Sequence, residues 1–344
     1  MTQRVSERRR RREQLHVLMD RLHIGAVLMI RPANFAWYTG GGDNRVDRSA
    51  PTGEAAVLVT RDGEYILTNS IEAQRMRDEQ TPDIPVLEYP WYDTWDVVLT
   101  ELVDIALLGT DAPVGRGRDV GADIAPLRYA LDQGAIERYR NVGADAARAV
   151  AEAGSEMYSG IQEWEALSLL EAACRRSGLY SPVAMAAGDG RLRTYRHPIP
   201  HAGACERRVM LVVCAERGGL YANLTRWVHF EEPDVDLRNR QHACDVILGR
   251  MREEATQTGN TLGDTFGSCL AFYADAGYPD EWKLHHQGGL TGYASRELIA
   301  HPGAQMQIAV GQAFAWNPSI TGAKAEETFV LTPEGPEVLT AIGH

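Results

Sequence analysis

Two short segments in the second half of the chain contain histidines that could move a proton. His197 and His201 lie in the segment TYRHPIPHAG, and His286 follows another histidine in the segment HHQGG. A neutral imidazole, with a pKa near ~6.5, can both accept and donate a proton at neutral pH. These histidines are therefore candidates for a general acid or base, although each could also be an ordinary loop or interior histidine.

Carboxylates and amides in three further segments could bind or polarise a substrate. Glu326 and Glu327 lie in AEETFVLTPEG, Asn223 lies in GGLYANLTRW, and Asn317 lies in WNPS. A carboxylate can orient a histidine or bind a cationic group, and an amide can both donate and accept hydrogen bonds. In a site without a metal ion, such groups polarise the scissile bond. Asn223 and Asn317 could equally be structural amides that satisfy buried backbone groups.

The elements that would position these residues form an α+β pattern in two parts. Residues 1–130 alternate helix and strand, with a helix near residues 6–23, an apolar strand IGAVLMI and a hairpin around the Asp62-Gly63 turn. Residues 131–344 show two helices, strands, two further helices and strands. This order indicates an internal pseudo-repeat, with helices packed outside a curved antiparallel sheet.

One predicted hairpin of the second part carries a candidate residue. The stretch VVCAERGGLYANLTRW, from Val212 to Trp227, has the pattern of two strands joined by a Gly-Gly turn. Two-residue hairpin turns need positive φ angles, which glycine adopts without strain. We therefore expect Asn223 to lie on the second strand of a tight hairpin.

Composition and charge exclude several classes of protein. The chain has 344 residues, a formal net charge of -12 and a pI of about 5.4, which argues against general nucleic-acid binding. It has no run of about 18 apolar residues, so we expect no membrane span. The N-terminus lacks the pattern of a secretory signal. Its 5 cysteines lack Cys-x-x-Cys spacing, which indicates reduced thiols in a cytoplasmic protein.

The run Arg8–Arg12 is an exception to the acidic balance. It could be a basic tail for an anionic partner. It also begins a stretch with apolar residues at helical spacing, namely Leu15, Leu18, Met19 and Leu22. We therefore expect the run to be the solvated start of a helix.

The order of these motifs resembles the pita-bread superfamily, which includes creatinase, prolidase, Xaa-Pro aminopeptidase and methionine aminopeptidase. The segment IGAVLMIRPANFAWYTGG resembles the N-terminal domain of creatinase-type members, and five catalytic-domain motifs follow in the family's order: YRHPIPHAG, GGLYANLTRW, HHQGG, WNPS and AEETFVLTPEG. The resemblance covers nearly the whole chain. It implies a creatinase-like N-terminal α/β domain over residues 1–130 and a pita-bread catalytic-type domain with a pseudo-two-fold over residues 131–344. These motifs are specific for a fold and not for an activity.

In catalytic members of the superfamily, two aspartates, one histidine and two glutamates bind two metal ions. The matching positions in this chain are Val212, Asn223, His286, Asn317 and Glu326, and a slip of register would replace Val212 by Val213 or Cys214. Valine offers no lone pair, and neutral amide oxygens bind divalent cations far more weakly than carboxylates do. The resemblance therefore implies a site without a metal pair, and we expect no cofactor.

Creatinase, which cleaves a C–N bond without a metal ion, is the member whose chemistry this pattern resembles. Its acid/base histidine matches His197, and the resemblance implies supporting roles for His286 and Glu326. We therefore expect a metal-independent hydrolase that cleaves a C–N bond of a small polar, nitrogen-containing substrate. As in many members with the N-terminal domain, we expect a homodimer. We expect no nucleic-acid or membrane partner.

Six further residues are candidates for binding the substrate or bracing the site: Asn223, Asn317, Tyr293, Glu327, Arg226 and His201. Tyr293 lies near the place where many family members have a second histidine, so it could be a phenolic donor or a wall residue. For Arg226 we expect an ion pair with Glu327 or a neighbouring carboxylate.

Two other functions are compatible with the sequence. A non-catalytic pseudo-peptidase would bind a peptide or a partner protein in the amide-lined pocket without turnover. A lyase or decarboxylase would use the same metal-free site to break a different bond. Mutation of the histidine that matches the acid/base would separate an enzyme from a binding module.

Overall fold

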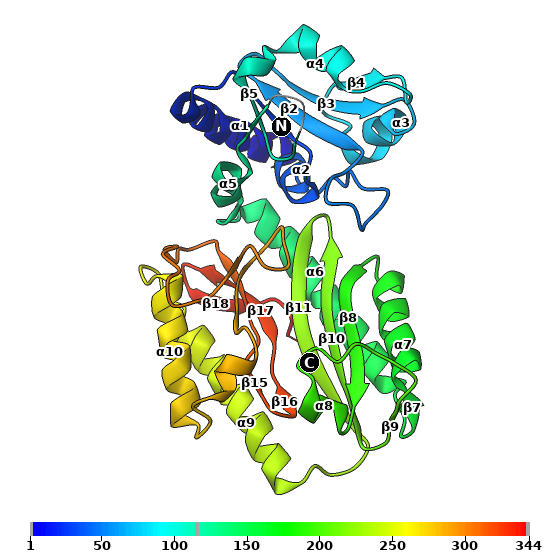
Figure 1. Cartoon of the computed structure of the whole chain (residues 1–344), viewed down its shortest axis with the longest axis vertical. Coiled ribbons are helices and arrows are strands. Elements are labelled where there is room, and N and C mark those ends of the chain that lie inside the picture. The colour runs from blue at the N-terminus through cyan, green and yellow to red at the C-terminus, as the bar shows by residue number, and fades with distance from the viewer. Residues whose placement is uncertain (1–2, 114–116, 342–344) are drawn as a thin grey trace. The chain divides into compact units, whose positions relative to one another are not determined.

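The computed structural model describes residues 3–113 and 117–341. The chain divides into two compact units, Met1–Gly134 and Ala135–His344 (Figure 1). No helix within the described residues combines the length and apolarity that a bilayer crossing requires.

The first unit is built on a six-stranded mixed sheet in the order β4-β3-β2-β1-β5-β6. Its strands are β1 (Ala26–Met29), β2 (Ala55–Thr60), β3 (Glu64–Asn69), β4 (Val86–Tyr89), β5 (Leu108–Thr110) and β6 (Arg118–Asp119). Strand β2 pairs antiparallel with β1 and β3, whereas the pairs β3–β4, β1–β5 and β5–β6 are parallel. The hairpin predicted around Asp62-Gly63 is confirmed, because β2 and β3 flank it.

Helices and helical turns connect these strands. They are α1 (Gln3–Leu22), α2 (Pro32–Thr39), α3 (Ala73–Arg75), η1 (Met76–Gln80), α4 (Asp96–Leu102), η2 (Ile105–Leu107), α5 (Gly121–Ile124) and η3 (Ala125–Arg128). Strand β1 is buried at every residue. Its Ala26 and Leu28 pack with Leu58, Leu67 and Leu108 in one apolar cluster, which explains the continuous apolar run in the sequence.

The run Arg8–Arg12 on α1 is only partly solvated, which corrects the expectation of a solvated helix start. The Nε of Arg8 donates to Glu64 at 2.7 Å. Arg11 is 2% exposed, and its guanidinium bonds to the carbonyl oxygen of Trp37 and to the carboxylate of Asp132. Because a buried charge needs partners, these arginines attach α1 to β3 and α2.

The second unit has the predicted order of two helices, strands, two helices and strands. In its first half, α6 (Gln133–Ser155) and α7 (Glu163–Arg176) precede the antiparallel sheet β11-β10-β8. The strands of this sheet are β8 (Tyr180–Gly188), β10 (Arg208–Arg217) and β11 (Leu220–His229). Short elements fill the connections: β7 (Ile161–Gln162), α8 (Arg191–Thr194) and β9 (Ala204–Cys205).

The second half repeats this plan with a longer sheet. Helix α9 (Val235–Arg250), its π-helical extension η4 (Met251–Ala255) and α10 (Leu262–Asp275) precede the antiparallel sheet β13-β12-β14-β17-β18. The strands are β12 (Gly288–Thr291), β13 (Leu298–Ile299), β14 (Ala313–Trp316), β17 (Glu327–Thr332) and β18 (Gly335–Val338). A turn η5 (Glu281–Leu284) and the two-stranded ribbon β15 (Ser319–Ile320) and β16 (Ala323–Lys324) complete it.

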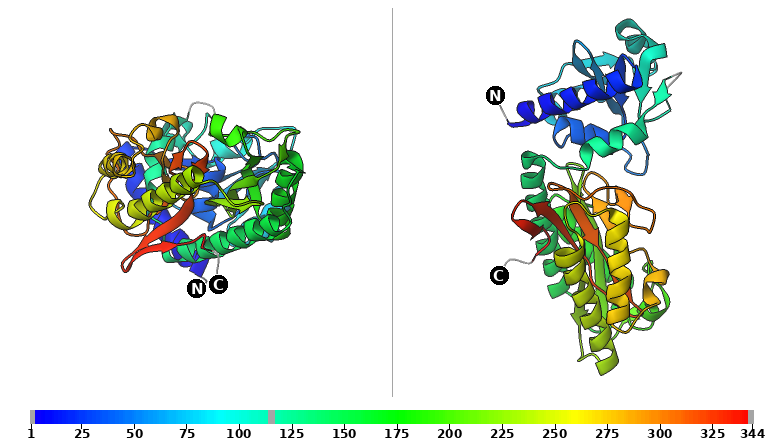
Figure 2. Two further views of the ribbon diagram at one scale, coloured as in Figure 1. Left: turned by 90° about the horizontal axis from the view of Figure 1, so that it is seen from below. Right: turned by 90° about the vertical axis from the view of Figure 1, so that its left-hand side faces the viewer.

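The two sheets of the second unit meet at β11 and β17. The backbone N–H of Asn223 donates to Thr328 Oγ1 at 2.8 Å, and the N–H of Thr225 donates to the carbonyl oxygen of Glu326 at 3.3 Å. Helices lie outside this joined sheet, with α6 and α7 along the first half and α9 and α10 along the second (Figures 1 and 2). The predicted helix-covered antiparallel arrangement is therefore confirmed.

The Gly218-Gly219 turn sets the register of the β10–β11 hairpin. Both glycines have positive φ angles, 60° and 81°, as a two-residue turn requires. The turn pairs Val212 with Thr225 and Cys214 with Asn223. Residues that lie directly opposite in an antiparallel pair share a face of the sheet. These four side chains therefore face the same side, where Thr225 contacts Glu326.

Candidate functional site

A cavity of about 510 Å³ in the second unit brings together four of the predicted site residues. His197, His286, Asn317 and Glu326 all line it, although they come from separate segments of the chain. The lining also includes Arg296 and Lys324, which the sequence analysis did not single out, and the matched position Val212. We call this space the histidine cavity.

The polar residues of the histidine cavity lie at strand ends and in loops. His197 follows α8, and His286 lies between η5 and β12. Asn317 follows β14, and Glu326 directly precedes β17. Because the ends of neighbouring strands meet at one region of a curved sheet, these loops converge on the junction of β11 and β17.

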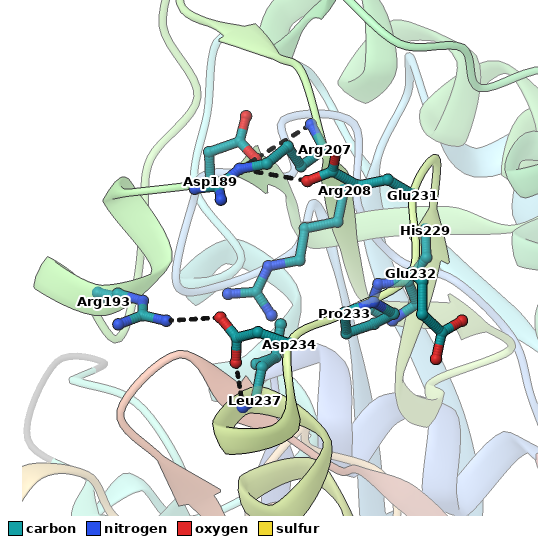
Figure 3. A pocket seen from close by; sticks show the side chains of 10 residues that line it. All are labelled: Asp189, Arg193, Arg207, Arg208, His229, Glu231, Glu232, Pro233, Asp234 and Leu237. Atoms are coloured by element: carbon teal, nitrogen blue, oxygen red, sulfur yellow. Dashed lines mark hydrogen bonds and ion pairs between the residues drawn. The ribbon is translucent and has the colours of Figure 1, made fainter.

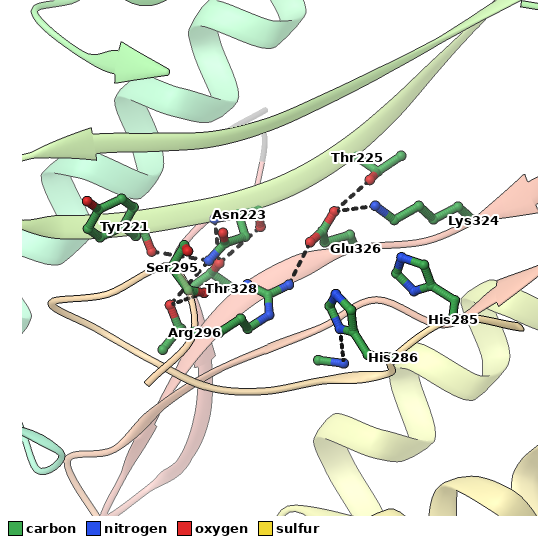
Figure 4. A network of polar contacts seen from close by, with 12 residues as sticks. Tyr221, Asn223, Thr225, His285, His286, Ser295, Arg296, Lys324, Glu326 and Thr328 are labelled. Atoms are coloured by element: carbon green, nitrogen blue, oxygen red, sulfur yellow. Dashed lines mark hydrogen bonds and ion pairs between the residues drawn. The ribbon is translucent and has the colours of Figure 1, made fainter. Parts of the chain in front are cut away.

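Glu326 is the centre of a buried charge cluster (Figure 4). Its Oε2 accepts hydrogen bonds from Thr225 Oγ1 at 2.8 Å and from Lys324 Nζ at 2.8 Å. Its Oε1 accepts one from an Arg296 Nη2 at 3.0 Å. Burial alone would raise the pKa of Glu326, but Lys324 and Arg296 lower it to about 2. Two cations therefore surround one carboxylate, and the cluster carries a net positive charge.

Three imidazoles lie beside this cluster. The Nε2 atoms of His197 and His285 are 3.0 Å apart, and the rings of His285 and His286 stack with centroids 4.5 Å apart. The N–H of Gly288 donates to His286 Nδ1 at 3.3 Å, so a neutral His286 carries its proton on Nε2.

All three histidines are neutral at pH 7. Burial is the main cause, and it lowers the pKa of His285 to about 3 and that of His286 to about 4. The same cause, followed by the positive charge of Lys324, lowers the pKa of His197. A neutral imidazole has a free lone pair for a proton, so each ring can act as a base.

The two amides of the prediction have different surroundings. Asn317 is 2% exposed and lines the histidine cavity, and its Oδ1 has no hydrogen-bond partner among the described residues. A buried polar atom without a partner is costly, so this amide is available to a ligand. The Oδ1 of Asn223 also has no partner among the described residues, but Asn223 donates to Thr291 Oγ1 at 3.2 Å and lies at the sheet junction outside the cavity lining.

Arg226 does not form the predicted ion pair with Glu327 or a neighbouring carboxylate among the described residues, although its charge and that of Glu327 still interact. Arg226 donates to the carbonyl oxygens of Thr225 and Thr340 at 2.8 and 2.7 Å. Glu327 pairs with Arg252 of η4. Because successive residues of a strand point to opposite faces, Glu327 turns away from the cavity that Glu326 lines. Neither residue of the predicted pair lines that cavity.

Tyr293 and His201 are also absent from the cavity lining. Tyr293 is 2% exposed and packs in the interior beside β12. His201 is exposed, and its backbone N–H donates to Glu163 Oε2 at 3.1 Å. The structure therefore separates these two residues from the group formed by His197, His286 and Asn317.

Two family models cover most of the chain. Residues 11–115 match the creatinase/prolidase N-terminal domain, and residues 137–333 match metallopeptidase family M24. The chain belongs to the M24 family. Together with the sheets and helices described above, these matches confirm the pita-bread architecture. No match was found among curated proteins.

Solved structures share this M24 fold over nearly the whole chain. The prolidase from Pyrococcus horikoshii OT3 is 18% identical with a TM-score of 0.81, covering 97% of this chain and 99% of its own. The X-Pro aminopeptidase from Thermotoga maritima MSB8 is 19% identical with a TM-score of 0.78, covering 94% and 98%. The N-terminal domain of FACT complex subunit SPT16 from Eremothecium gossypii is 13% identical with a TM-score of 0.69, covering 98% and 96%. At these identities the likeness shows the fold alone.

A pair of divalent ions does not fit the residues at the matched M24 positions. Val212 presents an apolar side chain to the cavity. Glu326 already accepts hydrogen bonds at both oxygens, and the adjacent charges of Lys324 and Arg296 repel a cation. Nitrogen atoms of His197, His285 and His286 lie within 4.8 Å of one another. The charge of Lys324 acts on all three rings, and that of Arg296 acts on His286, which opposes a cation there as well.

Three residues of this M24 site escaped the sequence analysis. Lys324 lies two residues before Glu326, and residues at this spacing share a face of an extended segment. The spacing of Lys324 and Glu326 could therefore have predicted that both side chains face the same cavity. His285 was visible as the neighbour of His286, and Arg296 had no local signal because a loop between β12 and β13 brings it to the cluster.

Proposed function

We propose that this M24 family member is a hydrolase that cleaves a C–N bond of a small, nitrogen-containing substrate without a metal pair. The observation that carries the proposal is the buried cluster of Lys324, Glu326 and Arg296 beside neutral histidines. Fixed charges and hydrogen-bond donors in a buried site can stabilise a transition state in place of a Lewis acid.

His197 is the general base and then the general acid in this proposal. It accepts a proton from the attacking water molecule and afterwards donates this proton to the leaving nitrogen. Its lowered pKa keeps the ring neutral before the reaction. One ring nitrogen faces His285 at 3.0 Å, so Nδ1 is the atom that is free to meet the reactants.

His286 and Asn317 stabilise the developing charge on the substrate oxygen. The His286 Nε2–H is a donor because its Nδ1 accepts from Gly288. The side chain of Asn317 lines the cavity, and its amide group supplies a second donor. Two positioned donors are the usual requirement for an oxyanion site.

Glu326 acts as a positioning residue in this scheme. Both of its oxygens accept hydrogen bonds from Thr225, Lys324 and Arg296, so it has little capacity left for a substrate. Its role is to hold the two cations at the cavity wall. This assignment revises the expectation that Glu326 takes part directly in the reaction.

The charge of the cluster favours a substrate with an anionic group, such as a carboxylate. The sequence analysis considered Glu326 and Glu327 as partners for a cationic group, but both already pair with arginine or lysine side chains. The Nη atoms of Arg296 donate to Ser295 and Glu326, but its Nε–H has no hydrogen-bond partner among the described residues and can donate to a carboxylate. The proposed substrate is therefore a small carboxylate with a hydrolysable C–N bond.

Compartment and assembly are further parts of the proposal. The five cysteines are all free and buried, which supports a reducing, cytoplasmic compartment. We also propose a homodimer, in line with the creatinase-type N-terminal domain. Analytical ultracentrifugation tests the dimer, and a monomer at micromolar concentration contradicts it.

A substrate screen with matched histidine variants tests the proposed function. The compounds are small carboxylates that carry amide, amidino or cyclic-imine groups. On any compound that turns over, His197→Ala lowers kcat by about 10²-fold or more, while the control His201→Ala stays close to the parent. Ligand binding without turnover, unchanged in His197→Ala, contradicts the proposal and favours a binding module.

A further inference from the structure

A second cavity of the same unit, of about 160 Å³, shares no lining residue with the histidine cavity (Figure 3). Its wall combines Asp189 after β8, Arg193 of α8, Arg208 of β10, His229 of β11 and residues that lead into α9. We call this space the arginine cavity. None of the residues that line the arginine cavity takes part in the proposed reaction, so an inference about this cavity goes beyond the proposed function.

Arg208 is the buried cation of the arginine cavity. It is 6% exposed, and its Cζ lies 5.0 Å from the centroid of the Trp227 ring. Among the described residues, its guanidinium has no hydrogen-bond or ion-pair partner. Figure 3 shows this guanidinium directed toward the side of the cavity where Arg193 and Asp234 lie. A buried charge without a polar partner is costly, so an anion that supplies one is strongly favoured.

Asp189 is the most buried acid of the lining, and it is already engaged. Its carboxylate accepts hydrogen bonds from the backbone N–H groups of Glu206 at 2.6 Å and Arg207 at 3.1 Å. The side chain of Arg207 also lies 3.8 Å from it. Asp189 is therefore held by its own loop. Its charge still acts on Arg208 through space, but the two side chains form no direct hydrogen bond or ion pair among the described residues.

The other acids lie at the solvent-exposed rim. Asp234 caps α9 by accepting from the N–H of Leu237 at 2.8 Å, and Glu232 pairs with Arg238 at 2.9 Å. Their side chains are 59% and 82% exposed, and Glu231 is 59% exposed. Water and salt screen such charges far more than they screen a buried one. The inner end of the cavity is therefore positive although its rim is acidic.

We propose that the arginine cavity binds a small oxyanion of the size of phosphate, with Arg208 as its buried anchor. The planar guanidinium can donate two parallel N–H bonds to one oxyanion. A volume of about 160 Å³ is well above the ~10–15 Å³ that a single water molecule needs, so the cavity has room for an anion of the size of phosphate.

Arg193 supplies the second contact at the mouth of the cavity. Its pair with Asp234 is long, at 3.7 Å, and both side chains are more than half exposed. Such a pair holds its partners weakly. The Arg193 side chain can therefore turn from Asp234 to a bound anion without leaving a buried acid unpaired.

Calorimetric titration of the full chain with inorganic phosphate tests this site, with sodium acetate as a parallel titration at the same ionic strength. We expect one phosphate per chain. Arg208→Gln weakens binding by about 10- to 100-fold, as expected for lost hydrogen bonds to a charged group. Arg193→Gln weakens it by about 3- to 10-fold, and the exposed control Arg238→Gln leaves it within about twofold.

Three outcomes overturn the proposal. The first is that the folded parent binds neither anion, and the second is that Arg193→Gln binds phosphate as tightly as the parent does. The third is that Arg296→Gln loses phosphate binding while Arg208→Gln keeps it. The last outcome assigns the anion to the histidine cavity, so it separates this site from the proposed function. If circular dichroism shows that Arg208→Gln is unfolded, Arg193→Gln decides the question. Tighter binding of acetate than of phosphate, with the same loss in Arg193→Gln, supports the site and assigns it to carboxylates.

Discussion

Glu326 and Glu327 are neighbours in the chain, but they belong to two different regions of the second unit. Glu326 faces the histidine cavity, where Lys324 and Arg296 lower its pKa to about 2 against the effect of burial. Glu327 faces the helical layer, where burial raises its pKa although Arg252 opposes the shift. The alternation of a strand separates the two carboxylates. Two cations act on each carboxylate, Lys324 and Arg296 on Glu326 and Arg252 and Arg226 on Glu327. The comparison shows that the balance between burial and these charges sets the direction of each pKa shift.

The largest expected effect is the loss of stability on removing the charge of Glu326. Glu326→Gln leaves the buried cations Lys324 and Arg296 without their counter-charge, which costs about 3–5 kcal/mol. Glu327→Gln costs at most about 2 kcal/mol, because the side chains of Glu327 and Arg252 are 14% and 23% exposed. Urea denaturation at pH 7 measures both variants. Equal losses would contradict the distinction between the two regions.

The acid dependence of stability sharpens the same comparison. The pKa of Glu326 in the folded protein lies below its ordinary value of 4.5. Its stabilisation is therefore complete above pH 4.5 and is lost as the pH falls through about 2. The full contribution is about 3 kcal/mol. The gap in unfolding free energy between the parent and Glu326→Gln should narrow between pH 7 and pH 3.

The contribution of Glu327 to stability changes with pH in the opposite direction. Its raised pKa means that the folded state disfavours the charged form, so this cost is relieved as the pH falls. Over the same pH range, the parent should gain stability relative to Glu327→Gln. Denaturation curves of the three proteins at several pH values decide the point. If the difference in unfolding free energy from the parent narrowed for both variants as the pH falls, the two carboxylates would have similar surroundings.

The smallest expected effect is that of His201→Ala. His201 is exposed and absent from the lining of the histidine cavity, so its substitution should change stability by less than about 0.5 kcal/mol. It should also change turnover of any substrate by less than about twofold. A larger loss of turnover would return His201 to the site and weaken the assignment of His197.

The sequence predicted the elements of this fold well because their signals are local. The Gly218-Gly219 pair predicted the hairpin, and its positive φ angles bear this out. The order of helices and strands indicated the two similar halves of the second unit. The resemblance to known motifs then brought His197, His286, Asn317 and Glu326 into one site, where the structure also places them.

The electrostatics of the site could not be predicted in the same way. Arg296 and Glu326 are 30 residues apart in the chain, and no local sequence pattern predicts their contact. Arg252 reaches Glu327 in a similar way, from η4 in the helical layer. Such long-range pairs depend on how loops and helices meet the sheet, and the pair of Arg296 with Glu326 adds to the positive charge of the histidine cavity.

The most direct test of the central claim is the metal content of the purified protein. The protein is produced with manganese, zinc, iron and cobalt in the growth medium, dialysed mildly and measured by elemental analysis. We predict less than stoichiometric metal in the parent, because Lys324 and Arg296 already neutralise the remaining carboxylate. Two equivalents of metal per chain would contradict a site that works without a metal pair.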